Sequence, residues 1–211
     1  MREKTRIKSA RERVIVYVDG FNLYFGMKEA GFNKYKWLDL YKLAQNLLKP
    51  DQNLIGVKYF TSRVSNNPEK QKRQTTYLEA LMHKGVEIFY GHYQRNTIEC
   101  SRCGNIWVNY NEKMTDVNIA THMLNDAFND RYDMAMLISG DSDLVPPIKS
   151  IHGFFENKRI FVAFPPKRTN NAISYVSKGS MVIGRKKLLD SLFPEEVKKK
   201  DGFILKKPKE W

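Results

Sequence analysis

The sequence predicts an α/β fold, with a central, mainly parallel sheet flanked by helices. Two observations predict it: short apolar runs recur along the chain, and segments with apolar residues at helical spacing separate them. Strands that alternate with helices pair in parallel, because each crossover helix carries the chain back across the sheet. The loops that follow the strands then share one rim of the sheet, which is where open α/β sheets bind ligands.

Five apolar runs have the character of buried strands, and a sixth is shorter. Strands are expected near residues 14–18, 54–60, 86–90, 134–138 and 159–164, with a short one at 181–183. Helices are expected between them over 23–30, 38–48, 69–84, 116–128, 144–155, 172–176 and 186–192. Gly31, Pro50 and Gly85 end three of these helices, and Thr115 is expected to cap the start of the fourth.

The length of 211 residues suits one domain with extensions. We expect a basic N-terminal arm at 1–13, the domain at 14–193 and a lysine-rich C-terminal tail at 194–211. Residues 91–113 interrupt the alternation of strands and helices, and we expect them to form a loop or hairpin outside the main sheet.

Two cysteines in this insertion have the spacing of a zinc knuckle. Cys100 and Cys103 enclose two residues and are followed by a glycine, and we expect them to face one another. Zinc needs four ligands, so His92 would add a third and a partner chain would have to supply the rest. A pair of free thiols is the alternative.

The charge of the chain predicts an anionic partner. Lysine and arginine number 36 against 23 aspartates and glutamates, which gives a net charge of +13. Nucleic acid is the simplest such partner, and a basic protein that is merely soluble is the alternative. No apolar run approaches the roughly 20 residues that span a membrane, and two cysteines make no secreted disulfide framework. We therefore expect a cytoplasmic protein without a membrane partner.

Carboxylates follow two of the expected strands. The strand near 134–138 runs into Ser139 and Gly140 and then Asp141 and Asp143, and the strand near 14–18 ends in Asp19. Asp116 begins a crossover helix, so it starts near the same rim. Asp is also a good turn former and helix N-cap, which is the structural alternative for these positions.

Four carboxylates from three segments would repel one another at this rim. Such a cluster is costly unless a cation neutralises it. Ligands that are all oxygen favour Mg²⁺ or Mn²⁺ over zinc. The sequence therefore predicts a magnesium or manganese site.

Three motifs resemble the signature blocks of the NYN domain, which belongs to the PIN-like nuclease superfamily and includes LabA-like proteins. They are Val18–Asn22, Glu112–Val117 and Ser139–Leu144, in this order. The resemblance implies a PIN-like three-layer fold and a metal-dependent nuclease, usually acting on RNA. Matched by motif, the acidic catalytic and metal-binding cluster is Asp19, Asp116, Asp141 and Asp143, and the polar residues that contact substrate are Asn22 and Ser139.

The activity expected from this resemblance is hydrolysis of RNA phosphodiesters by a Mg²⁺- or Mn²⁺-dependent ribonuclease, of the endonuclease type. Asp19 and Asp141 are expected as direct metal ligands, with Asp116 and Asp143 bound directly or through water. Cations on or near loops of the same rim would hold the phosphates, namely Arg63, Lys70, Arg73, Lys167 and Arg168. Each of the five is otherwise a solvated surface charge.

Other functions remain open for this pattern. A non-catalytic RNA-binding or regulatory module would keep the fold and the basic rim and use the acids structurally. A phosphatase or nucleotide-binding domain is disfavoured, because no Gly-rich phosphate loop follows the first strand. The expected partner is RNA, single-stranded or structured, and a homodimer is left open.

Overall fold

A six-stranded sheet forms the centre of the molecule. The computed structural model describes residues 11–64 and 67–211, without the side chains of 92–96 and 107–112. The expected arm at 1–13 therefore lies mostly outside the described residues. The strands lie in the order β3-β2-β1-β6-β7-β8 and all pair in parallel, which confirms the predicted fold class. They are β1 (Glu12–Asp19), β2 (Gln52–Thr61), β3 (Val86–Tyr90), β6 (Met134–Ile138), β7 (Arg159–Phe164) and β8 (Ser180–Val182).

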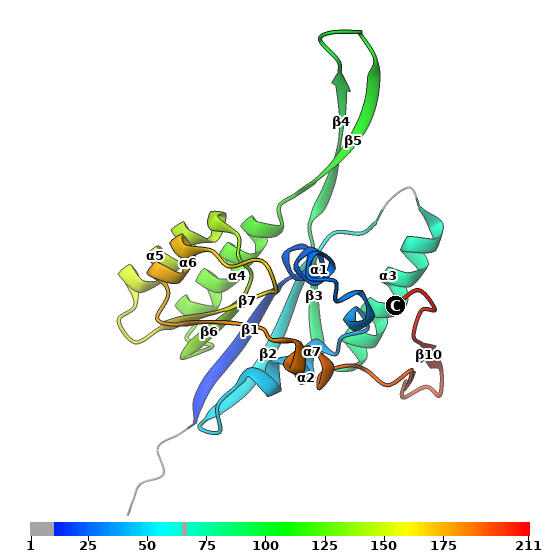
Figure 1. Ribbon diagram of the computed structural model, residues 1–211. Helices are drawn as coiled ribbons and strands as arrows, with labels where there is room; N and C mark the ends of the chain where they lie inside the picture. The colour runs from blue at the N-terminus through cyan, green and yellow to red at the C-terminus, as the bar shows by residue number, and fades with distance from the viewer. Residues whose placement is uncertain (1–10, 65–66) are drawn as a thin grey trace, which may run out of the picture.

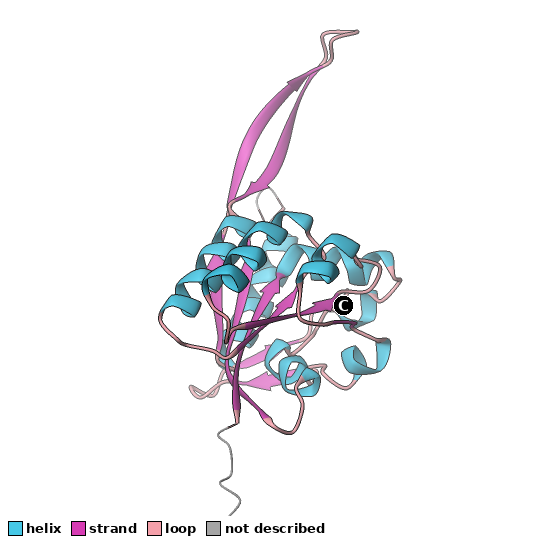
Figure 2. Ribbon diagram, turned by 90° about the vertical axis from the view of Figure 1, so that its left-hand side faces the viewer, coloured by secondary structure: helices cyan, strands magenta, loops and turns pink. Residues whose placement is uncertain are grey.

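Both faces of the sheet are covered by helices (Figures 1 and 2). Along β1, Val14, Val16 and Val18 point into one apolar cluster, while Ile15 and Tyr17 point into another. The first cluster is closed by α1 (Gly20–Glu29), α2 (Leu40–Leu47), α3 (Pro68–His83) and α7 (Arg185–Leu189). The second is closed by α4 (Thr115–Phe128), α5 (Val145–Phe154) and α6 (Asn171–Val176). Short 3₁₀ turns, η1 (Asn33–Tyr35) and η2 (Ser142–Leu144), complete the helical elements.

The order of the strands places a topological switch point between β1 and β6. The chain continues from β1 to β2 and β3 on one side, and from β6 to β7 and β8 on the other. The loops that follow β1 and β6 therefore diverge and leave a crevice between them, which is the usual ligand position in doubly wound sheets.

The insertion forms a hairpin with a sheet of its own. β4 (His92–Glu99) and β5 (Ile106–Lys113) pair with each other as an antiparallel, two-stranded sheet. Figures 1 and 2 both show this hairpin extending away from the body of the molecule. Cys100 and Cys103 lie in the turn at its far end.

The segment 194–211, expected as a lysine-rich tail, is instead folded against the domain. It contains the antiparallel pair β9 (Glu196–Lys198) and β10 (Ile204–Lys206). Val197 and Leu205 are buried in the same cluster as α3. The sequence gives no clear sign of this packing, because isolated apolar residues alternate with lysines whose side chains face solvent.

One expected cap is wrong in detail. Thr115 is the first residue of α4, and its cap is Met114, in a left-handed conformation with φ of 77°. The N-caps of α1 and α3 are Asp19 and Asn67, whose side chains accept hydrogen bonds from the first helical turn. Among the described residues, no helix combines the length and the apolar character that crossing a membrane requires.

Candidate active site

Asp19 stands at the carboxyl end of β1 and is almost fully buried. One carboxylate oxygen, Oδ1, accepts a hydrogen bond from the backbone N–H of Asn22 at 3.0 Å. The other, Oδ2, accepts from the hydroxyl of Ser139 at 2.8 Å. Asp19 therefore joins the end of β1 to the end of β6, across the switch point.

The loop after β6 is held by the same residues. The backbone N–H of Gly140 donates to Oδ1 of Asn22 at 2.9 Å, and that of Asp141 donates to Ser139 Oγ at 3.1 Å. Asp141 in turn accepts from the backbone N–H of Asp143 at 3.0 Å and caps η2. Asn22 and Ser139, predicted to contact substrate, thus also fix the positions of the acidic residues.

Gly140 lies where the backbones of two loops nearly touch. A Cβ built on it would fall 1.8 Å from the carbonyl oxygen of Arg168, in the loop after β7. Only glycine fits such an approach. The contact brings Arg168 beside the acidic residues, and its buried Nε has no hydrogen-bond partner among the described residues.

Asp116 enters the same region from the first turn of α4. Its pKa is raised to about 6, first by burial and then by the negative charges of Asp19, Asp141 and Asp143. This interaction places the four predicted carboxylates in one electrostatic field, although they come from three segments of the chain.

These residues form a small cleft, which we name the acidic cleft. It measures about 140 Å³ and is lined by Asp19, Phe21, Asn22, Phe25, Asp116, Asp141 and Arg168. Asp143 lies on a neighbouring hollow that also contains Asp116. Three of the four predicted acids thus line the acidic cleft. Asp143 lines the neighbouring hollow, and Asp116 lines both.

The chemistry of the acidic cleft fits a hard divalent cation. Its charged donors are carboxylate oxygens, which suit Mg²⁺ or Mn²⁺. Burial first and neighbouring negative charge second raise the pKa of Asp116, and a cation would relieve the second cause. Among the side chains that the structure describes, no three His, Cys, Asp or Glu residues stand close enough to hold one ion jointly. Waters would therefore have to complete the shell, as they commonly do around Mg²⁺.

The predicted phosphate-binding cations are distributed over a wider surface. Arg168 lines the acidic cleft and pairs with Glu29. Lys70 and Arg73, on α3, line a separate pocket beside α1. Arg63 is exposed after β2 and its guanidinium lies 4.7 Å from the ring centre of Tyr90. Lys167 is exposed in the loop after β7, with φ of 62°.

The cysteine pair has no third ligand among the described side chains. Both cysteines are free thiols, and Cys103 is exposed. Hydrogen bonds from the backbone N–H groups of Arg102 and Cys103 and from the Cys103 thiol lower the pKa of Cys100. The side chain of His92, named as a further ligand, lies outside the described residues.

Sequence reasoning missed the aromatic residues beside the cleft. Phe21, Tyr24 and Phe25 are at least partly exposed on α1, and Trp211 comes from the far end of the sequence. The spacing of Phe21, Tyr24, Phe25 and Lys28 along one helical face was a signal that could have found the first three. No local pattern could have brought Trp211 to them.

Known proteins resemble the chain at two levels. A crystal structure of a protein of unknown function from Vibrio parahaemolyticus shares the fold, with a TM-score of 0.62 and 22% identity. That match covers 88% of this chain and 98% of the other. The 6-hydroxy-3-succinoylpyridine 3-monooxygenase HspA of Pseudomonas putida is 25% identical over 203 residues. The match covers 79% of this chain and 64% of that protein, so the chain spans less than two thirds of this relative.

The family model of the NYN domain matches residues 13–180. The match contains all three motifs and every element that lines the acidic cleft. The chain therefore belongs to the NYN domain family, a family of PIN-like nucleases.

Proposed function

We propose that this chain is a Mg²⁺- or Mn²⁺-dependent ribonuclease that hydrolyses RNA phosphodiesters at the acidic cleft. The observation that carries the proposal is the acidic cleft itself, which Asp19, Asp116 and Asp141 line together although they come from three segments of the chain. A helix start and two strand ends thereby contribute carboxylates to one charged site at the switch point. Membership of the NYN family supports the reaction class.

In this proposal, Asp19 and Asp141 hold the cation directly, and Asp116 and Asp143 hold it directly or through water. When bound, Mg²⁺ or Mn²⁺ supplies Lewis acidity toward the scissile phosphate and a more acidic water. Ser139 keeps Asp19 oriented through its hydroxyl. Arg168, which lines the cleft, binds the phosphate by its guanidinium.

The attacking water must lose a proton as the phosphorus–oxygen bond breaks. We assign Asp116 to accept that proton, because its carboxylate lines the acidic cleft beside Asp19 and Asp141. The leaving oxygen takes a proton from solvent, so the reaction consumes one water for each bond that is cut.

The test is cleavage of labelled single-stranded RNA with Mg²⁺ or Mn²⁺, with and without chelator. Asp19→Asn and Asp141→Asn should each abolish cleavage, while circular dichroism shows the fold retained. Asp51→Asn is the matched control. Asp51 is an exposed aspartate just before the amino end of β2, and the acidic cleft lies at the carboxyl ends of the strands. Metal-dependent cleavage by Asp19→Asn at the wild-type rate would refute the assignment of the site.

The non-catalytic alternative predicts a different result in the same cleavage assay. An RNA-binding or regulatory module would bind the labelled strand with and without chelator and leave it uncut. No effect of Mg²⁺ or Mn²⁺ on thermal unfolding would also favour this alternative, because an ion that binds only the native state raises stability.

A second candidate activity comes from the relative in Pseudomonas putida, which is named for an oxygenation of a pyridine carrying a succinoyl group. One observation favours it: the pocket beside α1 has aromatic walls and amines, which suit an anionic heteroaromatic compound. Monooxygenation also consumes dioxygen and a reductant. Dioxygen consumption that depends on added 6-hydroxy-3-succinoylpyridine, in the presence of a reductant, would support this activity over RNA hydrolysis.

A further inference from the structure

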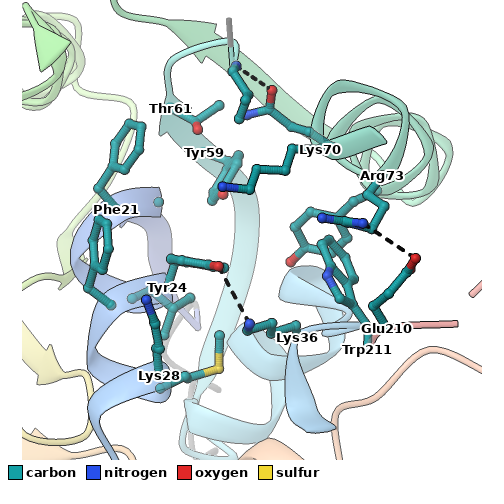
Figure 3. A pocket seen from close by; sticks show the side chains of 17 residues that line it. Phe21, Tyr24, Lys28, Lys36, Tyr59, Thr61, Lys70, Arg73, Glu210 and Trp211 are labelled. Atoms are coloured by element: carbon teal, nitrogen blue, oxygen red, sulfur yellow. Dashed lines mark hydrogen bonds and ion pairs between the residues drawn. The ribbon is translucent and has the colours of Figure 1, made fainter. Parts of the chain in front are cut away.

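A pocket of about 490 Å³ lies between α1, β2 and α3, beside the acidic cleft. We name it the aromatic pocket. Figure 3 shows Tyr24 and Trp211 on opposite sides of it, with the amine of Lys70 pointing into the space from α3. A lining of aromatic rings and amines suits a planar aromatic ligand that carries negative charge.

One wall of the aromatic pocket is fixed by the core. The hydroxyl of Tyr77 donates to the carbonyl of Leu38 at 2.9 Å. The ring of Trp211 meets the ring of Tyr77 nearly edge-on, with centroids 5.4 Å apart, and lies 6.3 Å from the ring of Trp37. Trp211 is therefore held in place as a platform on which a flat ring can stack.

The opposite wall is an aromatic face of α1 that the core does not use. Leu23 and Met27 bury the inner face of the helix, whereas Tyr24 and Phe25 are 37% and 41% exposed. An exposed aromatic stripe at helical spacing, next to a concave surface, is typical of a binding site.

The charge of the pocket is positive. Lys28, Lys36 and Lys70 form no ion pair with any described residue, and Arg73 pairs with Glu210 at 3.4 Å. The amine of Lys36 lies 4.8 Å from the ring centre of Tyr24, so cation and aromatic surface occur together. Four cations and one carboxylate favour an anion near the rings.

The aromatic pocket and the acidic cleft share a wall. Phe21 and Phe25 line both, and their rings stack with centroids 6.3 Å apart. A ligand that reaches from one site to the other must cross this pair of rings. A single strand of RNA, which alternates phosphates with flat bases, has the repeating chemistry for such a path.

We propose that the aromatic pocket binds the nucleotide next to the phosphate that is cut, with its base stacked between Tyr24 and Trp211. Lys70 and Arg73 then hold that nucleotide's phosphate. The inference rests on the proposed ribonuclease activity and gives the same site a subsite for a base. Stacking tolerates any base, so the pocket selects single-stranded over paired RNA rather than one sequence.

The test measures binding of a fluorescein-labelled eight-nucleotide RNA in chelator by anisotropy. A series of further probes lacks the base at one position each, so the base that the pocket binds is identified without reference to cleavage. Tyr24→Ala and Trp211→Ala should each weaken binding of the intact probe about tenfold. Removal of the base should cost the wild type a similar factor and cost the variants little more, because the stacking partner is already gone.

Tyr175→Ala is the matched control, because Tyr175 is 90% exposed on α6, on the other face of the sheet. It should bind like the wild type. Trp211→Phe keeps a ring on the platform and should recover most of the affinity lost in Trp211→Ala. Recovery shows that the loss reflects stacking and not a damaged fold.

The outcomes separate the subsite from the activity. Wild-type affinity in Tyr24→Ala and Trp211→Ala, beside cleavage that still depends on Asp19, overturns the subsite and leaves the ribonuclease intact. Failure of the wild type to cut RNA, beside base-dependent binding that both variants lose, overturns the ribonuclease and supports a base-binding pocket. Binding of 6-hydroxy-3-succinoylpyridine, beside RNA affinity that neither variant changes, overturns the subsite in favour of a small ligand.

Discussion

Both carboxylate oxygens of Asp19 accept hydrogen bonds from the chain itself, so the fold sets the orientation of this side chain. Asp116 differs, because its surroundings are other carboxylates and its pKa is raised. The two residues therefore differ in what controls them. Hydrogen bonds fix the side chain of Asp19, whereas burial and the charges of the other aspartates raise the pKa of Asp116.

Asp116→Asn should stabilise the metal-free protein at neutral pH. The pKa of Asp116 is about 6 in the fold, above an ordinary value of about 3.9 for the unfolded chain. Its protonated form therefore favours folding below about pH 4, and this contribution is lost as the pH rises through 6. Solvent screens part of the repulsion, so the expected gain above pH 7 is about 1 kcal/mol.

Urea unfolding in chelator at pH 4 and pH 7.5 measures this effect. The gain should be present at pH 7.5 and absent at pH 4, and Asp51→Asn should show no such difference. An equal change in unfolding free energy at both pH values would mean that repulsion within the cluster is not its cause.

At the level of elements, the loops after β6 and β7 form one unit through Gly140. Gly140→Ala would place a methyl group against the carbonyl of Arg168 and force the two loops apart. We expect a loss of about 1–3 kcal/mol in unfolding free energy. We also expect a large loss of RNA cleavage, because the hydrogen bond from Gly140 to Asn22 belongs to the same contact.

Gly153→Ala provides the matched control for this prediction. A Cβ at Gly153, in α5, meets no atom within 4 Å. Alanine is the better helix former there, so this variant should be about as stable as the wild type or more stable by up to about 1 kcal/mol. Thermal unfolding of both variants decides the point, and equal stability of the two would show that the loops yield without cost.

The reactive side chains of the β4–β5 hairpin are the two cysteines in its turn. Hydrogen bonds lower the pKa of Cys100, so more of it is thiolate at neutral pH. Iodoacetamide at pH 7 should therefore alkylate Cys100 faster than Cys103, although Cys103 is the more exposed. Peptide mapping by mass spectrometry measures the two rates. Stoichiometric zinc in the purified protein, with both thiols protected, would contradict the free-thiol interpretation.

The sequence predicts the sheet well because its signals are local. Apolar runs such as 134–138 are buried on both faces, and the strand–turn–acid pattern marks both ends of the switch point. Contacts between residues far apart in the sequence produce no local pattern of this kind. Trp211 reaches the pocket because β9 and β10 pack on the domain, and nothing near it in the sequence indicates this.

Buried charge is the other feature that local patterns cannot show. Lys58 on β2 and Asp126 on α4 form an ion pair of 2.5 Å, with both side chains almost fully buried. The hydroxyl of Tyr17 donates to the same carboxylate at 2.6 Å. In the sequence, Lys58 interrupts an apolar run and looks like a surface residue. Its partner is 68 residues away, so only the fold reveals the pair.

For the molecule as a whole, a net charge of +13 contrasts with the group of aspartates at the acidic cleft. Cations stand after β2, on α3 and after β7, around the rim that contains the four aspartates. A strand of RNA held by this rim would present its backbone to the cations while one phosphate lies at the acids.

Binding of single-stranded RNA should therefore weaken steeply with salt. Each phosphate contact should contribute about −0.7 to the slope of log K against log salt concentration. Arg63→Glu, Arg73→Glu and Arg168→Glu should each lower affinity and reduce the slope by about one contact. Lys49→Glu is the control, since Lys49 is exposed near the amino end of β2, away from the rim formed by the carboxyl ends of the strands. Full affinity in the three arginine variants, with binding lost when Lys198 and Lys200 are neutralised, would move the RNA from the rim to the β9–β10 hairpin.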